Sequence, residues 1–365
     1  YRAPRFPDAR TFRRFVVLFP AYKEDRVIAS SVRSFLQQDY PQELFDIIVI
    51  SDQMQDATNE DLRSLPIRLL IADYRDSSKA KALTMAMESV SGEIVAIMDA
   101  DNLTSPDFLA EINRAFDNGA RSVQAHRTGK NMNTDISVLD GISEEINNGI
   151  FRSGHNALGL SAALSGSGMA FEAEWFRKNV RLLETAGEDK ELEVLLLRQR
   201  IHTTYLPQIP VYDEKTQKEE AIGNQRKRWI AAQFGILRHS LSGLREAVSK
   251  GNMDYCDKIL QWMLPPRLIQ LAGVFGLTFI FTVIGVWQAV QGTGQEWTAA
   301  IKWWILSAAQ IMAMLLPIPG RLLDKRLGKA ILRIPLLALT TLGNLFKLKG
   351  AYKKFIHTEH YENSH

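Results

Sequence analysis

Residues 93–101, with the sequence EIVAIMDAD, join a run of apolar residues directly to two aspartates. The run at 93–98 has the β-branched, apolar composition of a buried strand. Comparable runs precede it at 14–19 (RFVVLF), 45–50 (FDIIVI) and 67–71 (IRLLI). Helical spacing fills the intervals between the runs, over 27–36, 59–64 and 79–90. This alternation indicates βαβ units, so the sequence predicts an α/β fold with a parallel sheet.

Acidic side chains follow two of these runs, at the strand ends where ligands bind in a parallel sheet. Asp52 follows the second run, Asp99 and Asp101 follow the fourth, and Tyr22 and Glu24 lie in the turn after the first. Carboxylates two positions apart lie on one side of an extended chain and can hold one hard divalent cation. The alternative is a turn in which an aspartate caps the next helix. The sequence has no glycine-rich dinucleotide or P-loop motif, which excludes those two nucleotide-binding classes.

Composition limits the remaining classes. Of the 365 residues, 46% are hydrophobic and 23% are charged, so the chain can bury a core and is not disordered. Lys and Arg number 44 against 41 Asp and Glu, and a net charge of +3 excludes a broad basic surface, so we expect no nucleic-acid partner. The single cysteine, Cys256, excludes a disulfide framework and a cysteine-rich zinc site.

Apolar residues gather near the end of the sequence. Residues 268–290 carry no charged side chain, and at about 1.5 Å per residue they match the ~30 Å hydrocarbon core of a bilayer. Residues 301–319 carry only Lys302, near the start, and end at the helix-stopping PIPG. A shorter run within 330–347 suits an interfacial or re-entrant helix. The sequence thus predicts a membrane region over 267–365 with two spanning helices.

Charge predicts the orientation of these helices. The loop 291–300 has no Lys or Arg, whereas 321–333 and 347–354 are rich in them. The positive-inside rule then puts the loop outside and both basic segments in the cytoplasm. Residues 1–14 are also basic and resemble a juxtamembrane segment of the kind that follows an anchor helix. We therefore expect an integral membrane protein with its α/β domain in the cytoplasm.

The region 235–266 has an amphipathic pattern, and we expect it to lie in the cytoplasmic interface of the membrane. Apolar residues recur there every three or four positions, at Ile236, Leu237, Leu241, Leu244 and Val248. The alternative is a helix that packs against the α/β domain.

Two further motifs carry chemistry. Residues 187–190 (GEDK) form an acidic turn that opens a helix, and a structural cap is one explanation for it. Residues 225–229 (QRKRW) place cationic side chains beside an indole. Such a group suits either a membrane surface or a clamp for a diphosphate beside a stacked sugar.

The order D, DAD, ED and QRKRW resembles the D, DxD, (E/T)ED and QxxRW set of family 2 glycosyltransferases. The resemblance is to membrane-integrated enzymes of the cellulose, chitin and hyaluronan synthase type. FPAYKEDRVIASSVRSFLQQDYP and VISDQMQDAT resemble the first two strands of that family as well. The resemblance covers about 15–234 and implies a GT-A fold, a nucleotide-binding α/β sandwich.

The resemblance also implies roles for individual residues. Asp189 would be the catalytic base, with Glu188 supporting it. Asp101 and Asp99 would hold Mg²⁺ or Mn²⁺ on the diphosphate. The acceptor would meet the loop 165–169 (SGSGM), through Ser167 and Gly168, together with Gln225 and Trp229. The implied donor-binding residues are Pro20, Ala21, Tyr22, Glu24, Asp52, Lys79, Lys81, Asp99 and Arg228.

The implied reaction is an inverting, metal-dependent transfer of a sugar from a UDP-sugar to a glycan or lipid-linked acceptor at the membrane. The first hypothesis is synthesis of a β-linked polysaccharide, which a homo-oligomer or an export partner would complement. The alternative is non-processive transfer of one or a few sugars to a lipid or lipid-linked acceptor. A membrane-bound nucleotidyl- or phosphosugar-transferase and an anchored binding module are rivals, and the QRKRW motif argues against the first of these.

Overall fold

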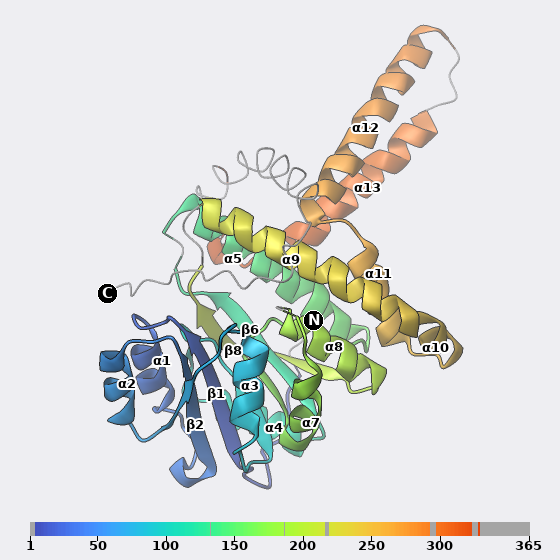
Figure 1. Ribbon diagram of the computed structural model, residues 1–365. Coiled ribbons are helices and arrows are strands. Elements are labelled where there is room, and N and C mark those ends of the chain that lie inside the picture. Colours follow the sequence, from blue (N-terminus) through green and yellow to red (C-terminus); the bar gives the residue numbers. More distant parts are fainter. Residues whose placement is uncertain are drawn as a thin grey trace.

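The computed structural model describes residues 4–131, 133–185, 187–215, 219–292, 297–322 and 328, with the side chains of helix α9 described from Trp229 onward. Figure 1 shows an α/β domain with further helices packed above it and a helical pair, α12 and α13, extending away from it. The predicted interfacial run at 330–347 and the basic tail lie outside the described residues.

The described strands form a single sheet in the order β3-β2-β1-β4-β7-β6-β8-β5. The predicted strands at 14–19, 45–50, 67–71 and 93–98 are confirmed as β1 to β4, with ends that differ by a few residues. The strands are β1 (Phe15–Tyr22), β2 (Phe45–Asp52), β3 (Arg68–Ala72), β4 (Ile94–Ile97), β5 (Leu103–Thr104), β6 (Ser122–Gly129), β7 (Met169–Glu172) and β8 (Thr203–Asp213).

Strand direction brings the chemistry of the chain to one edge of the sheet. β1 pairs in parallel with β2 and β4, and β2 pairs in parallel with β3. β7 is antiparallel to both β4 and β6, and β8 is parallel to β6. The carboxyl ends of β1, β2, β4, β6 and β8 therefore meet at the same edge. The sheet is mixed, because β7 and β5 run against the others.

Alternation along β1 builds a core on each face of the sheet. Phe15, Val17 and Phe19 pack on one face, with α1 (Ile28–Phe35), α2 (Asp56–Arg63) and α4 (Phe108–Asp117). Val16 and Leu18 pack on the other face, with α3 (Lys79–Met87) and α7 (Ala173–Asn179). The result is a three-layer α/β/α sandwich. Short 3-10 turns are η1 (Gln42–Leu44), η3 (Val180–Leu182), η4 (Leu241–Gly243) and η5 (Gly320–Leu322).

A second helical layer joins the sandwich to the apolar pair. It consists of α8 (Glu188–Arg198), α9 (Glu219–Ser240), α10 (Leu244–Ser249) and α11 (Met253–Met263). Ile236 and Leu237 of α9 are buried there against Val194 and Leu197 of α8. The chain turns at η4, so the apolar stripe of this region does not form one continuous surface, and its predicted place in the cytoplasmic interface stays a prediction. Part of the stripe fills this core, while Leu241 and Val248 are exposed.

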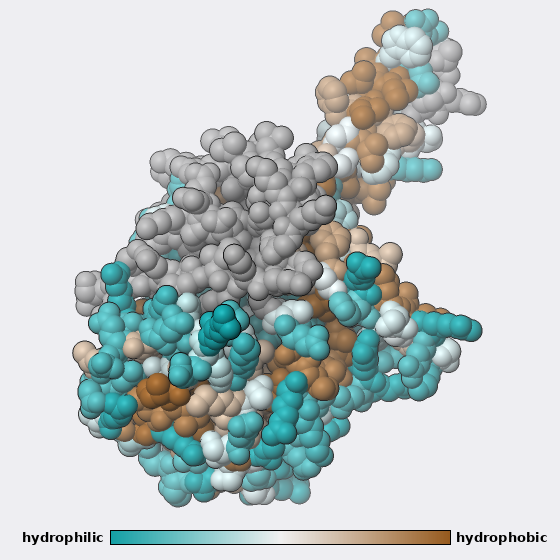
Figure 2. All heavy atoms as spheres, viewed as in Figure 1, coloured by the Kyte–Doolittle hydropathy of each residue, from teal (hydrophilic) through white to brown (hydrophobic). Residues whose placement is uncertain are grey.

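Helices α12 (Arg267–Val290) and α13 (Trp297–Leu315) are long and apolar enough to cross a membrane, by length and composition. They match the predicted spans 268–290 and 301–319, although the second begins and ends four residues earlier. Most of their large apolar side chains are exposed, and Figure 2 shows hydrophobic residues over much of the pair.

The ends of the helical pair that face the domain meet α5 (Asp135–Asn147). Val138 and Ile142 of α5 pack against Ile318, just beyond α13. At the start of α12, Arg267 Nη2 donates to Ser143 Oγ at 3.0 Å. The helix continues from α5 through a π-helical turn, η2 (Asn148–Gly154), and α6 (His155–Ala157). Gly149 in that turn lies against Pro317, and an added Cβ would overlap the proline ring.

Candidate active site

The ends of β1 and β2 form the first part of the site. Lys23 and Gln53 directly follow these strands and have left-handed backbone conformations, with φ of 57° and 55°. Such strained positions in non-glycine residues gather at functional sites. Lys23 N–H donates to the Asp52 carbonyl at 3.1 Å, which ties the two turns together. Of the residues predicted to bind the sugar donor, Pro20, Ala21 and Tyr22 are the last three residues of β1.

Asp52 is a buried carboxylate at this edge. It is 4% exposed, and its Oδ1 accepts a hydrogen bond from Ser77 Oγ at 3.0 Å. Burial raises the pKa of Asp52, and the Ser77 hydrogen bond and the charges of Lys23 and Lys81 partly oppose that rise. Asp52 therefore presents a fixed hydrogen-bond acceptor close to Lys81, which is also predicted to bind the sugar donor.

The DAD turn follows β4 and is held by two other segments. Asp101 is 4% exposed, and its Oδ2 accepts from the backbone N–H of Glu214 at 2.7 Å. Asn102 Nδ2 donates to Asp101 Oδ1 at 3.2 Å, and Asn102 Oδ1 accepts from the Asp99 N–H at 3.0 Å. Helix α4 begins only at Phe108, beyond β5. The alternative that an aspartate of this turn caps the next helix is therefore wrong.

Lys79 joins three parts of the predicted site. Its ammonium lies 2.6 Å from Asp99 Oδ1 and 3.2 Å from Glu188 Oε1, and it donates to the Gly166 carbonyl at 2.8 Å. Burial alone would lower the pKa of Lys79, but the two carboxylates hold it above its usual value. Burial raises the pKa of Glu188, against the opposing influence of Lys79. The structure thus brings the DAD turn, the acidic turn and the glycine-rich loop together around one cation.

Asp189 lies at the first turn of α8, next to Glu188. Its Oδ1 accepts from the Lys190 N–H at 2.8 Å, and 21% of its side chain is exposed. The preceding Gly187 packs against α9, because an added Cβ would lie 3.2 Å from Ala232 Cβ. Trp229 is one helical turn before Ala232 and is 41% exposed. Residues three apart share a helix face, so the indole lies on the side of α9 that meets the start of α8.

The loop 165–169 needs its glycines for the backbone path. Gly166 and Gly168 have φ of 88° and 61°, in the left-handed region that favours glycine. A Cβ on Gly168 would also lie 2.9 Å from Val211 Cγ2. Ser167 is fully buried, and its Oγ has no hydrogen-bond partner among the described residues. In this conformation the loop presents its backbone rather than the Ser167 hydroxyl.

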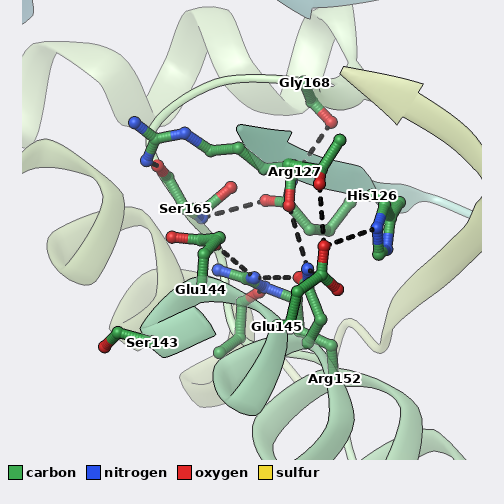
Figure 3. Close-up of polar contacts among 12 residues, drawn as sticks. His126, Arg127, Ser143, Glu144, Glu145, Arg152, Ser165 and Gly168 are labelled. Atoms are coloured by element: carbon green, nitrogen blue, oxygen red, sulfur yellow. Dashed lines mark hydrogen bonds and ion pairs between the residues drawn. The ribbon is translucent and has the colours of Figure 1, made fainter. Parts of the chain in front are cut away.

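A buried ionic cluster beneath this loop is absent from the sequence-based predictions. Figure 3 shows Arg127 and His126 of β6 opposite Glu144, Glu145 and Arg152 of the α5–η2 helix. Arg152 Nη1 lies 2.7 Å from Glu144 Oε1, and His126 Nε2 lies 3.4 Å from Glu145 Oε1. The signal that could have found it is a charged residue at the end of each of two further strands, β6 and β8.

The acidic residues fit a divalent cation that is bound together with a substrate. Within the described ranges, no group of three or more His, Cys, Asp or Glu side chains could hold a metal ion. Asp99 and Asp101 offer two carboxylates, which are hard oxygen ligands of the kind that Mg²⁺ and Mn²⁺ prefer. Such ions commonly take their remaining ligands from phosphate oxygens and water. The donor set therefore fits an open site completed by a diphosphate.

Two predicted residues cannot be placed beyond their backbone. Gln225 and Arg228 lie on α9, but their side chains are outside the described part of that helix. Glu24 lies just before α1, where its carbonyl accepts from the Val27 and Ile28 N–H groups.

Comparisons with known proteins give the family. The family model described as "Glycosyltransferase like family 2" matches residues 13–232. The β-monoglucosyldiacylglycerol synthase of Trichormus variabilis is 24% identical over 259 residues, which cover 67% of this chain and 51% of that protein. The probable glycosyltransferase YdaM of Bacillus subtilis is 28% identical over 93 residues, covering 24% of this chain and 22% of that protein. The chain thus spans about half or less of the length of these curated relatives.

A solved structure shares the fold. The mannosyltransferase PcManGT from Pyrobaculum calidifontis, in complex with GDP-Man and Mn²⁺, superposes with a TM-score of 0.50 at 16% identity. The alignment covers 86% of this chain and 91% of that one, which shows a GT-A-like α/β fold. Because the family model matches more than half of the chain, the chain belongs to glycosyltransferase family 2 and is a sugar-transferring enzyme.

Proposed function

We propose that this enzyme transfers a sugar from a UDP-sugar to a lipid acceptor at the cytoplasmic face of a membrane, with inversion at the sugar carbon. The observation that carries the proposal is the attachment of the candidate spanning helices to the site. Arg267, at the start of α12, bonds to Ser143 of α5, and the chain beyond α13 packs on the same helix. The next two residues of α5, Glu144 and Glu145, belong to the buried cluster (Figure 3).

A second attachment runs through α11, which leads directly into α12. Lys258 of α11 lies 2.6 Å from Glu193 of α8, the helix that begins with Glu188 and Asp189. Asp254 of α11 accepts from both the N–H and the hydroxyl of Ser161, just before the glycine-rich loop. A lipid headgroup at the membrane surface would therefore be close to the site. The relative from Trichormus variabilis is named as a glucosyldiacylglycerol synthase, which is consistent with this acceptor class.

The donor would occupy the edge formed by β1, β2 and β4. Asp52 would accept a hydrogen bond from the uridine, and Lys79 and Lys81 would face the diphosphate. Asp99 and Asp101 would hold Mg²⁺ or Mn²⁺. When bound, such an ion offsets the negative charge that develops on the leaving diphosphate. The positive charge of the ion and of the two lysines at the leaving group would favour departure of UDP with the electron pair of the broken bond.

Asp189 would act as the general base. A hydroxyl of the acceptor attacks the sugar carbon as the bond to UDP breaks, and its proton passes to the Asp189 carboxylate. A helix N-terminus favours a negatively charged side chain, which suits a base at the first turn of α8. A single displacement inverts the anomeric centre, so an α-linked donor gives a β-linked product. Glu188 would hold Lys79 in place rather than touch the acceptor.

A donor and acceptor screen tests the proposal. The full chain would be purified in detergent or nanodiscs, supplied with diacylglycerol and a panel of UDP- and GDP-sugars, and its products weighed by mass spectrometry. We expect one or a few sugars on the lipid and a β linkage by NMR. Asp189→Asn should bind UDP-sugar normally but lose transfer by about 10²-fold or more. Residual transfer above roughly a tenth of wild type would contradict the role of Asp189.

Synthesis of a β-linked polysaccharide is the second candidate, because the order of the motifs resembles processive synthases. It predicts a ladder of products whose length grows with time in the same screen. A homo-oligomer or export partner would then be needed to pass the polymer across the membrane.

A further inference from the structure

Arg127 lies at the same sheet edge as the DAD turn but belongs to none of the predicted motifs. It is near the end of β6, just after a register shift between Ala125 and His126 in the pairing with β8. Such irregularities change the direction of side chains near functional sites. The Arg127 side chain is 19% exposed. A guanidinium that is shielded from most of the solvent needs partners on several sides.

The two terminal nitrogens of Arg127 contact different segments. Nη2 lies 2.6 Å from Asp213 Oδ2, at the end of β8. Nη1 donates to the Ser165 carbonyl at 3.0 Å, at the start of the glycine-rich loop. Arg127 therefore ties the end of β8 to that loop. Its planar fork suits this task, because two donors are held in a fixed relative direction.

The contact with Asp213 leads to the predicted metal ligand. Glu214 is the next residue after Asp213, and its N–H donates to Asp101 Oδ2 at 2.7 Å. The position of the Glu214 N–H depends on where the end of β8 lies. Arg127 fixes that end through Asp213, so Arg127 and Asp101 are linked through two contacts and the peptide bond between Asp213 and Glu214.

The surrounding charges make the end of β8 rigid. Lys215 Nζ lies 2.9 Å from Asp213 Oδ1 and 3.9 Å from Glu144 Oε2. Asp213 and Lys215 are each only 4% exposed in their side chains. In a low-dielectric interior a paired charge is held strongly, and removal of one partner leaves the other at a large penalty. Arg127 is the member of this cluster that reaches both the loop and β8.

We propose that Arg127 is a positioning residue that orients Asp101 for a divalent cation, by fixing Asp213 and therefore the Glu214 N–H. The inference rests on the proposed function, because it takes Asp101 as a ligand of the cation on the donor diphosphate. In this proposal Arg127 would contact neither the substrate nor the ion. It acts through a hydrogen bond to a ligand, and partners of that kind commonly change metal affinity by about 10–100-fold when lost.

Mn²⁺ binding in the presence of UDP tests the proposal without turnover. The EPR signal of free Mn²⁺ would be titrated with the full-length wild type, Arg127→Met and Arg127→Lys. Lys258→Met is a matched control, because Lys258 is also a buried cation 2.6 Å from a buried carboxylate, Glu193. Thermal unfolding of each variant measures the purely structural effect of losing a buried cation.

We expect Arg127→Met to weaken Mn²⁺ binding by about tenfold or more, and Arg127→Lys by less, because lysine keeps the charge but loses the fork. Lys258→Met should lower the unfolding temperature and leave Mn²⁺ affinity unchanged. Affinity within about twofold of wild type in both Arg127 variants would overturn the proposal. If Arg127→Met does not fold, unchanged affinity in Arg127→Lys and Asp213→Asn overturns it equally. A wild type that binds no Mn²⁺ with UDP would instead overturn the proposed donor site, and the inference with it.

Discussion

The Lys79→Met substitution is a direct probe of how the site is assembled. It removes a cation that lies 2.6 Å from Asp99 and 3.2 Å from Glu188, and it leaves both carboxylates in place. Removing one partner of a fully buried ion pair lowers the free energy of unfolding by about 3–5 kcal/mol. The side chains of Lys79, Glu188 and Asp99 are 17%, 12% and 32% exposed, so solvent screens part of the interaction. We therefore expect a loss of roughly 2–3 kcal/mol in the free energy of unfolding.

The loss should also depend on pH. The raised pKa of Lys79 gives stability that is complete below its ordinary value of 10.5 and is lost as pH rises through the folded value, so the titration of Lys79 itself adds no pH dependence at neutral or acid pH. In the variant the pKa of Glu188 rises further above 4.5, because its opposing cation is gone. A carboxyl with a raised pKa destabilises the fold as pH rises through that pKa. The deficit of Lys79→Met should therefore shrink on acidification.

Thermal unfolding in detergent measures both effects. The expected loss corresponds to a fall of roughly 5–10 °C in Tm for a domain of this size. Lys81→Met is the matched control, because Lys81 lies two residues later on α3 and is exposed. Among the described residues, its Nζ donates to the Asp76 carbonyl at 2.7 Å and lies 5.9 Å from the centroid of the Tyr74 ring. It should change stability by less than about 0.5 kcal/mol. Equal unfolding temperatures for the two variants, at both acid and neutral pH, would refute this account of the site.

Three further outcomes follow from the geometry. Chelation should stop turnover until Mg²⁺ or Mn²⁺ is restored, and Asp101→Ala should lose UDP-dependent Mn²⁺ binding; wild-type affinity in that variant would contradict the metal assignment. Trp229→Ala should raise the KM for the acceptor far more than it slows hydrolysis of the donor, whereas an equal loss of both would place the indole elsewhere. Burial lowers the pKa of His155 below 6.5, so its contribution to stability is complete above that pH and falls as pH drops towards the lowered pKa. His155→Gln should accordingly make Tm less sensitive to acid, and an unchanged pH profile would count against the burial argument.

The first four strands could be predicted from sequence because each is a short, nearly continuous apolar run that ends at a turn residue. The strands β6 and β8 could not. β8 contains Pro207 and Pro210, which normally argue against an interior strand, and the structure accommodates Pro210 at the register shift with β6. The insertion of β7 between β4 and β6 is a matter of tertiary pairing that local patterns do not encode.

The same limit explains which parts of the site were found. Asp52, Asp99 and Asp101 follow predicted strands, so the shared direction of those strands predicts that they meet. Arg127 and Asp213 depend on β6 and β8, and their role became visible only with those strands in place. The apolar stripe of α9 and α10 shows a second limit. Spacing identified an apolar face, but packing against α8 and α11 decided that Ile236 is buried while Val248 is exposed.

The π-helical turn Asn148–Gly154 constrains the length of the chain as well as its composition. Such a turn commonly arises when one residue is inserted into an α-helix. Deletion of one residue there would restore an ordinary helix and rotate every later side chain by about 100°. Arg152, which bonds to Glu144 and to the Ala163 carbonyl, would then point away from both. Insertions and deletions should therefore be tolerated less well in this turn than single substitutions, and a sequence alignment that opens a gap within it would pair Arg152 with the wrong residue.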